Sequence, residues 1–390
     1  MSTLRVNKLE NTNTSNGGIS IDTSGHVSID GANFPTSGPL TNRNLIINGA
    51  MQVAQRGTQV TGVTTAGYRT CDRFNFAASF LGTWTVDQST DAPSGFSNSF
   101  KVTCTTADAS PFASDYLFYY HLIEAQNCQS IGFGTSDAKP LILSFWVKSN
   151  KTGNASFAIM QADNSYKLAS FQYSISSADT WEYKTIAIPA DTAGIMNNDN
   201  GIGLQVEWWL NSGSNFSGGS FQPTWSTYSN PNRNVSNLGV GGAVNDYWQI
   251  TGVQLEVGET ATPFEHRSYG DELAKCQRYF ERMNYTYDAW TFIAVATVPG
   301  TSSAINMIGS IYYETKRTDP TVTSTAANTF RQNGGGVSDN VATTIGFAME
   351  TPKSCRIEAA ATGIWRTSGL SGWISRQSTS TCYIDFDAEL

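Results

Sequence analysis

The chain has 390 residues, of which 39% are hydrophobic and 14% charged, and its formal net charge is −8. The 20 Phe, 16 Tyr and 10 Trp residues exclude a disordered chain, because disordered chains are poor in aromatics and rich in charge. The acidic balance and the lack of Lys/Arg clusters argue against nucleic acid and against an anionic membrane surface as partners. No apolar run reaches the roughly 18–20 residues of a membrane span, so no membrane insertion is expected. The N-terminus lacks an apolar signal core, which predicts synthesis in a cytoplasm.

The first 41 residues form a segment with its own pattern. The tetrapeptide Ile-Ser-Ile-Asp at residues 19–22 returns as Val-Ser-Ile-Asp at residues 27–30, with a turn sequence between the two copies. The alternation of apolar and polar residues predicts two short strands, which cannot bury one apolar face alone. We therefore expect either a hairpin on the main domain or, preferably, a stem that winds with sister chains into a threefold structure. The apolar stem positions are Ile19, Ile21, Val27 and Ile29.

Residues 42–267 contain many short apolar runs separated by Gly, Asn and Ser turns. Alternating apolar residues at 141–147, 202–208 and 253–257 are typical of strands with one buried face. The spacing predicts an antiparallel sandwich of the jelly-roll kind. Residues 211–242 lack this alternation and are predicted to form a long loop that leaves the sandwich, a place where function is often found.

A helix is predicted over residues 268–283, capped at Ser268 or Asp271. Its apolar stripe would consist of Leu273, Cys276, Tyr279, Phe280 and Met283. Residues 284–390 return to strand patterns, and about 100 residues suffice for a second, smaller β-sandwich. The predicted fold class is therefore all-β: an N-terminal β segment, a jelly-roll-like sandwich, a short helix and a smaller C-terminal sandwich.

Two aromatic clusters have the composition of a carbohydrate site. Sugar rings pack an apolar face on aromatic side chains, and their hydroxyls pair with Asn, Asp, Gln or Arg. In the first cluster, neighbouring Trp208 and Trp209 must point to opposite faces of a strand, so one is expected in the core and the other outward. The alternative is a loop pinned by aromatic anchors to its own sandwich or to a neighbouring subunit. The candidate residues of this cluster are Trp209, Trp225, Tyr228, Asn232 and Arg233.

The second cluster is Trp365, Arg366 and Trp373, joined by a Thr-Ser-Gly-Leu-Ser-Gly stretch. It is typical of an exposed strand–loop–strand tip, and a carbohydrate site is one interpretation. The other is a plug at an interface between subunits.

Catalytic and metal chemistry find little support in the sequence. Residues 197–201 are rich in Asn and Asp but lack the acidic spacing of a calcium loop, so a turn is predicted. The six cysteines and three histidines are not spaced as metal ligands, and the cysteines are expected to be buried free thiols. Glu207, Asp246 and Glu256 could act as a catalytic pair in glycoside hydrolysis only if two of their carboxyl groups lie at the separation that this reaction requires on either side of the glycosidic bond. No enzyme activity, metal or cofactor is expected.

Several segments resemble a β-sandwich module of bacteriophage tail fibres and related virion proteins. Residues 44–57 with 72–74 are similar to the opening of that module, and residues 143–149 to its central strand. The most specific resemblance runs from 250 to 280: ITGVQLEVG, then ATPFEHR, then ELAKCQRYF. Residues 316–323 and 385–390 resemble the tips of such fibres, and the N-terminus is similar to attachment segments of phages of cyanobacteria.

This resemblance implies a homotrimer in the virion tail, assembled in the host cytoplasm. The N-terminal segment, with Leu4, Val6 and Leu9, would attach to other tail or virion proteins, and the C-terminal domain would be distal. The expected function is that of a tail fibre that binds host surface glycan such as lipopolysaccharide or capsule. One alternative is a purely structural virion component, such as a head or neck fibre or a baseplate-associated protein. Another is a polysaccharide depolymerase spike, against which the lack of a solenoid repeat argues.

Overall fold

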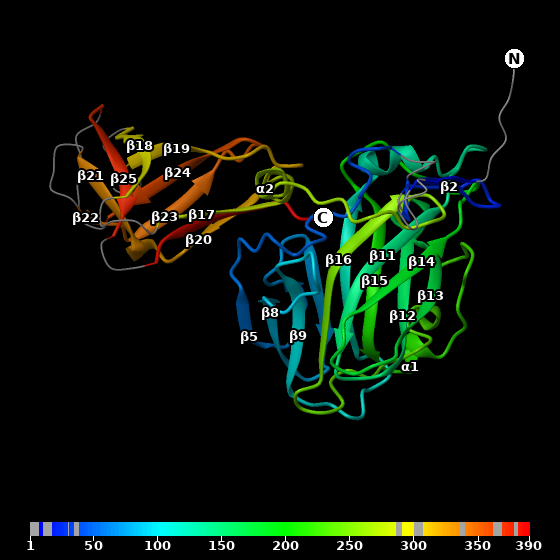
Figure 1. The fold of residues 1–390 in the computed structure, drawn as a ribbon. Coiled ribbons are helices and arrows are strands. Elements are labelled where there is room, and N and C mark those ends of the chain that lie inside the picture. The colour runs from blue at the N-terminus through cyan, green and yellow to red at the C-terminus, as the bar shows by residue number, and fades with distance from the viewer. Residues whose placement is uncertain are drawn as a thin grey trace, which may run out of the picture. The chain divides into compact units, whose positions relative to one another are not determined.

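The computed structural model describes residues 8–10, 18–29, 31–34, 39–285, 291–299, 307–334, 340–361, 369–377 and 381–390. The chain divides into two compact units, unit 1 (Met1–Glu272, with Leu390) and unit 2 (Leu273–Glu389). Strands dominate both units, which confirms the all-β prediction (Figure 1). Among the described residues, no helix has the length and apolar character needed to cross a membrane.

Unit 1 is built on two six-stranded antiparallel sheets. Sheet I has the order β13-β12-β15-β10-β7-β6, and sheet II has the order β14-β11-β16-β9-β8-β5. The strands of sheet I are β6 (Gly67–Tyr68), β7 (Phe74–Ser79), β10 (Tyr116–Glu124), β12 (Gly153–Gln161), β13 (Lys167–Ile175) and β15 (Ile202–Ser212). Those of sheet II are β5 (Gln59–Val63), β8 (Thr83–Ser89), β9 (Ser99–Thr106), β11 (Leu141–Ser149), β14 (Glu182–Ile188) and β16 (Tyr247–Val257). Short helical turns connect them: η1 (Ala125–Ile131), η2 (Ala162–Asn164), α1 (Ser214–Ser217) and η3 (Asn230–Asn232).

The core of unit 1 lies between the two sheets and is largely aromatic. Tyr119 of sheet I stacks on Phe100 of sheet II, with ring centroids 3.9 Å apart. Trp208 from sheet I and Trp248 from sheet II are fully buried in the same core. The alternating runs at 141–147, 202–208 and 253–257 lie in β11, β15 and β16. Their apolar residues alternate because every second side chain of a strand points toward the core. The predicted jelly-roll-like sandwich is therefore confirmed.

Several of the segments that carry the resemblance meet in unit 1. The side chain of Asn44 donates from Nδ2 to the carbonyl oxygen of Val253 at 3.0 Å and accepts from the amide of Leu255 at 3.1 Å. Arg267 donates from Nη2 to the carbonyl oxygen of Asn44 at 2.5 Å. The amide of Val253 donates to the carbonyl oxygen of Gly49 at 2.9 Å. These motifs therefore hold the opening segment of the module against β16.

The N-terminal segment forms a four-stranded sheet of order β1-β2-β3-β4. Its strands are β1 (Lys8–Glu10), β2 (Gly18–Ile21), β3 (Val27–Ile29) and β4 (Ala32–Asn33). Leu9 pairs with Ile19, which pairs with Ile29, so these apolar side chains share one face. They remain 55%, 42% and 41% exposed in the single chain. Leu4 and Val6 lie outside the described residues, and a stem shared with sister chains stays a prediction.

Unit 2 contains a three-stranded sheet of order β17-β26-β20 and a seven-stranded sheet of order β22-β21-β25-β18-β19-β24-β23. Its core includes Met307, Ile357 and Phe386. The strands of the first sheet are β17 (Phe280–Asn284), β20 (Thr321–Ser324) and β26 (Tyr383–Asp387). Those of the second are β18 (Phe292–Thr297), β19 (Met307–Tyr312), β21 (Phe330–Gly334), β22 (Asn340–Val341), β23 (Thr344–Ala348), β24 (Ser354–Ala360) and β25 (Ser371–Arg376), and a turn η4 (Ala327–Thr329) precedes β21.

The helix predicted over residues 268–283 is shorter than expected. It is α2 (Tyr269–Gln277), and Ser268 accepts a hydrogen bond from the amide of Asp271 at 3.2 Å, as a capping residue does. The prediction was wrong for its C-terminal part, because residues 280–284 form strand β17 and pair with β26. The aromatic residues there suit a strand, and β26, from the far end of the chain, supplies the hydrogen-bonding partner.

Candidate functional site

The predicted long loop leaves β15 and crosses the outer face of sheet I before it enters β16. Leu168 of β13 exchanges two backbone hydrogen bonds with Ser226, each 2.8 Å long. The amide of Ser170 donates to the carbonyl oxygen of Gln222 at 2.8 Å. The loop therefore covers the outer face of sheet I instead of extending into solvent.

Trp209 is buried under this loop. Trp208 points into the sandwich core and Trp209 to the opposite face, as alternation requires, but both are 0% exposed. The Trp209 ring stacks on Phe118 at 4.5 Å and lies 5.3 Å from Phe216 of the loop. The two tryptophans therefore point to opposite faces as expected, but the expectation that Trp209 is exposed as a platform for sugar is wrong, because the loop covers it.

A buried ion pair joins the loop to the sheet. Arg233 donates from Nη2 to Oε1 of Glu207 at 2.5 Å and from Nε to Oε2 at 3.1 Å, and its guanidinium lies 4.7 Å from the Trp209 ring centre. Burial opposes the charged guanidinium, but the adjacent Glu207 carboxylate outweighs burial and raises the pKa of Arg233. Arg233 also donates from Nη1 to the hydroxyl of Tyr228 at 3.1 Å. Arg233 is therefore a positioning residue for Tyr228.

Two more candidates of the first cluster also hold the loop. Trp225 donates from Nε1 to the carbonyl oxygen of Pro189 at 2.7 Å and packs edge-on against Phe133 at 5.5 Å. Asn232 accepts a hydrogen bond from the amide of Ser220 at 3.0 Å. These contacts match the alternative of a loop pinned to its own sandwich by aromatic anchors. Tyr228 differs from the other candidates of this cluster, because it remains 37% exposed.

Tyr228 borders a cleft of about 280 Å³, which we call the tyrosine cleft. Tyr166 lies beside it, 41% exposed, with its ring centre 6.4 Å from that of Tyr228 and the ring planes at 64°. The cleft thus has one accessible aromatic ring, Tyr228, with amide, hydroxyl and ammonium groups, and a second accessible ring, Tyr166, lies next to Tyr228. Its lining residues are Asn164, Ser165, Lys167, Ala193, Thr227 and Tyr228.

Tyr166 was not a candidate in the sequence, because β12 and β13 on either side of it were not predicted. Ser165 and Tyr166 have φ values of 52° and 56°, in the left-handed region. Asn and Gly usually occupy such hairpin positions, and strained residues of this kind cluster at functional sites. The sequence feature that could have identified Tyr166 as a candidate is an aromatic residue within a polar turn. The turn places the Tyr166 ring outside the sheet, next to Tyr228.

The cation that lines the tyrosine cleft is already paired. Lys167 Nζ lies 2.7 Å from Oδ2 of Asp191, which is 6% exposed. Asp191 also accepts hydrogen bonds from the side chain of Gln161 at 2.8 Å and from the amide of Ala193 at 3.1 Å. Burial alone would raise the pKa of Asp191, but the bonds from Lys167, Gln161 and Ala193 together hold it below its ordinary value. Asp191 is therefore a carboxylate at neutral pH.

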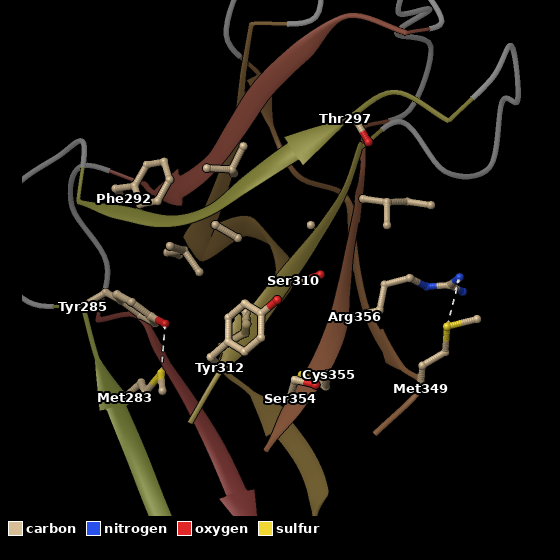
Figure 2. Close-up of a pocket in the computed structure, with 16 residues that line it drawn as sticks. Met283, Tyr285, Phe292, Thr297, Ser310, Tyr312, Met349, Ser354, Cys355 and Arg356 are labelled. Carbon is tan, nitrogen blue, oxygen red and sulfur yellow. Dashed lines mark hydrogen bonds between the residues drawn. The ribbon is translucent and has the colours of Figure 1, made fainter. Parts of the chain in front are cut away.

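Unit 2 has a larger groove of about 950 Å³ (Figure 2). In the described residues, β18 pairs with β19 through Ala296 with Gly309 and through Thr297 with Ile308, and the groove lies where the two strands then diverge. Tyr312, at 75%, is its most exposed aromatic ring. The apolar residues that line it include Met283, Tyr285, Phe292, Val295, Tyr312 and Met349.

The composition of this groove is that of a protein-contact surface. Aromatic residues, Met and Arg are enriched at protein interfaces, and Lys, Glu and Asp are depleted. Among the described residues that line the groove, Arg356 alone is charged, and it pairs with Glu358. Trp373, 42% exposed, pairs across the sheet with Val295, which lines the groove. Trp365 and Arg366 lie outside the described residues, so the second predicted cluster remains a prediction.

The carboxylates considered for hydrolysis are buried and bonded. Glu256 accepts from the hydroxyl of Thr262 at 2.7 Å, and Asp246 accepts from the amides of Gly241 and Ala243 at 3.1 and 3.0 Å. Neither the tyrosine cleft nor the groove of unit 2 is lined by Asp or Glu within the described part of the chain.

The described residues contain no group of three or more His, Cys, Asp or Glu side chains placed to hold a metal ion. In the Asn- and Asp-rich segment, Asp199 accepts a hydrogen bond from the amide of Gly201 at 2.9 Å, as the predicted turn requires. All six cysteines are buried free thiols, as predicted.

Comparisons with known proteins identify no family. No family model matches the sequence, and no curated protein matches it. Solved structures that resemble the chain include the enzymatically active domain of bacteriophage CBA120 tailspike protein 4, at 13% identity and a TM-score of 0.28, over 55% of this chain but only 22% of that one. A second is TmCBM61 in complex with β-1,4-galactotriose, at 10% identity and a TM-score of 0.25, over 56% of this chain and all of that one. A third is the xylan-binding CBM22-1 domain of Paenibacillus barcinonensis Xyn10C, at 10% identity and a TM-score of 0.25, over 58% of this chain and 99% of that one. At such scores the chain is assigned to none of these groups, and their ligands are properties of those proteins.

Proposed function

We propose that the protein binds carbohydrate without cleaving it and that the tyrosine cleft is the binding site. The observation that carries this proposal is the pair of exposed rings, Tyr166 and Tyr228, beside a cleft lined by amide and hydroxyl groups. An aromatic ring gives the apolar face of a sugar a surface to pack on, and the polar groups can bond its hydroxyls. Cleavage by paired carboxylates is not part of the proposal, because neither described concavity is lined by Asp or Glu.

In the finer form of the proposal, the protein is a homotrimeric bacteriophage tail fibre that attaches the virion to host surface glycan. It is assembled in the host cytoplasm and joins other virion proteins through its N-terminal segment. The sequence resemblance supports this form, as does the exposed apolar face formed by Leu9, Ile19 and Ile29. Three weak sugar sites on one particle would bind a glycan surface with a large gain in avidity.

The trimer predicts the mass of the protein in solution. We expect sedimentation equilibrium to give three times the chain mass of 42.2 kDa. Replacing Ile19 by Ser should weaken the assembly, because it removes an apolar side chain from the face that sister chains would cover. The matched control is Ser20→Ala, since Ser20 alternates with Ile19 on the same strand. A monomeric mass at high protein concentration would contradict the stem.

The binding site is tested by removing the two rings one at a time. We expect Tyr166→Ala and Tyr228→Ala each to weaken binding about tenfold or more, because buried aromatic contacts contribute about 2 kcal/mol or more at such sites. Binding is measured on immobilised lipopolysaccharide, capsular polysaccharide and a panel of neutral oligosaccharides, and soluble products are assayed for new reducing ends.

The matched control is Phe112→Ala, which removes a 78% exposed ring that does not line the cleft. It should leave binding unchanged. If Tyr312→Ala abolishes binding and Tyr228→Ala does not, the binding site lies in unit 2 and not in the tyrosine cleft. If new reducing ends form, the protein cleaves the glycan, which contradicts the proposal of binding without cleavage.

A further inference from the structure

Each cation at the tyrosine cleft is neutralised by a buried carboxylate. Lys167, which lines the cleft, lies 2.7 Å from Asp191. Arg233, which donates a hydrogen bond to the hydroxyl of Tyr228, has its Nη2 atom 2.5 Å from Oε1 of Glu207. An acidic sugar needs a cation that is free to pair with its carboxylate, because an unpaired charge is costly to desolvate. In the described residues, the cleft offers none, and Asp191 would repel such a group.

The remaining polar groups of the cleft are uncharged. The described structure records no hydrogen bond from the hydroxyls of Ser165 and Thr227, and Asn164 donates only a long bond, 3.3 Å, to the carbonyl oxygen of Ala193. Hydroxyls and amides both donate and accept, so they can bond neutral sugar hydroxyls in either sense. These groups complement a neutral sugar and not an acidic one.

The size of the cleft restricts the ligand further. Sites for drug-sized molecules occupy about 300–1,000 Å³. A cleft of about 280 Å³ lies just below that range, which favours a short sugar unit over a long chain. The two tyrosine rings, at 64° to one another, offer separate surfaces for such a unit.

We infer that the tyrosine cleft recognises a short, uncharged sugar unit and discriminates against uronic and sialic acids. This inference rests on the proposed function of the same cleft. Selectivity comes from the Lys167–Asp191 pair. Asp191 neutralises the positive charge of Lys167, so the carboxylate of an acidic sugar has no free cation to pair with at the wall of the cleft.

The test compares sugars that differ only in charge. Calorimetric titration of the full chain with galactose oligosaccharides and with galacturonic acid oligosaccharides of equal length changes one group, a hydroxymethyl for a carboxylate. We expect the neutral series, or the equivalent glucose and glucuronic acid pair, to bind at least about tenfold more tightly. Equal or tighter binding of the acidic series, abolished by Tyr228→Ala, would overturn this inference and leave the proposed function standing. Binding of any series unaffected by both Tyr166→Ala and Tyr228→Ala would instead overturn the proposed function.

Two variants change the selectivity in opposite directions. Asp191→Asn releases Lys167 and should raise affinity for the acidic series about tenfold, whereas Lys167→Gln leaves Asp191 unpaired and should lower it further. The matched control is Asp163→Asn, which removes a nearby carboxylate that bonds Asn197 and not Lys167. Thermal unfolding of each variant shows that it is folded. An unchanged ratio of the two affinities in both folded variants would contradict the role of the Lys167–Asp191 pair.

Discussion

Replacing Arg233 by Met should lower the free energy of unfolding by about 3–5 kcal/mol, because the Glu207 carboxylate would be left buried without its counter-charge. Glu207 is 0% exposed and receives bonds from Arg233 and from the indole of Trp209, at 2.9 Å. Arg233 also packs on the Trp209 ring and bonds the hydroxyl of Tyr228. Urea unfolding of the full chain, followed by tryptophan fluorescence, measures the loss.

A double variant separates the lost charge from the lost packing. Glu207→Gln with Arg233→Met removes both charges, and replacing both partners of a buried pair is often nearly neutral. We therefore expect the double variant to unfold at higher urea than Arg233→Met alone. A single-variant cost below about 1 kcal/mol would mean that the pair is solvated, contrary to its burial. Tyr228 should lose its placement in Arg233→Met, and with it the affinity for glycan.

The second large effect is expected at Gly49. A Cβ atom added to Gly49 would lie 2.1 Å from the carbonyl oxygen of Val253, a backbone atom that cannot move aside. Gly49→Ala should therefore push the opening segment away from β16 and break the 2.9 Å bond from the amide of Val253 to the carbonyl oxygen of Gly49. Overpacking of this kind costs about 1–3 kcal/mol, and the lost hydrogen bond adds to it. The unfolding midpoint measures the change.

Gly270→Ala is the matched control. Gly270 lies in α2, and apart from its chain neighbours and the backbone of the helix no atom lies within 4 Å of the position of an added Cβ. Alanine in a helix is favoured over glycine by about 0.5–1 kcal/mol, so this variant should be neutral or slightly more stable. Similar losses in both variants would show that any added methyl group is harmful and that the contact with Val253 is not the cause.

The strand predictions succeeded where every second side chain of a strand enters the core between the two sheets. The alternation at 141–147 and 202–208 follows from burial between two sheets, and the structure places these residues in β11 and β15. The helix prediction failed after residue 277, because pairing of β17 with β26 depends on residues about a hundred positions away. Local periodicity carries no information about such a distant partner.

The candidate site was predictable only in part. Composition directed attention to the loop, and its residue Tyr228 lines the tyrosine cleft, so its role in binding stays a prediction. Trp209 was misassigned because strand alternation shows which face a side chain points to, but not whether a distant loop covers that face. Tyr166 was missed because a tight turn between two unpredicted strands brings it to Tyr228.

The motifs that carry the family resemblance have a structural role in this chain. Asn44, Gly49, Val253 and Arg267 bond one another or pack together and hold the opening segment on β16. The residues of the tyrosine cleft lie outside those motifs. The resemblance therefore indicates a scaffold, and under the proposed function the specificity for a sugar would depend on loops that the scaffold positions.

The central claim is that the tyrosine cleft binds carbohydrate, and a crystal structure of the full chain with a bound neutral oligosaccharide tests it most directly. The account predicts a sugar ring packed against Tyr166 or Tyr228, with its hydroxyls bonded to Asn164, Ser165 or Thr227. An oligosaccharide bound in the groove between β18 and β19 of unit 2, with the tyrosine cleft empty, would contradict it.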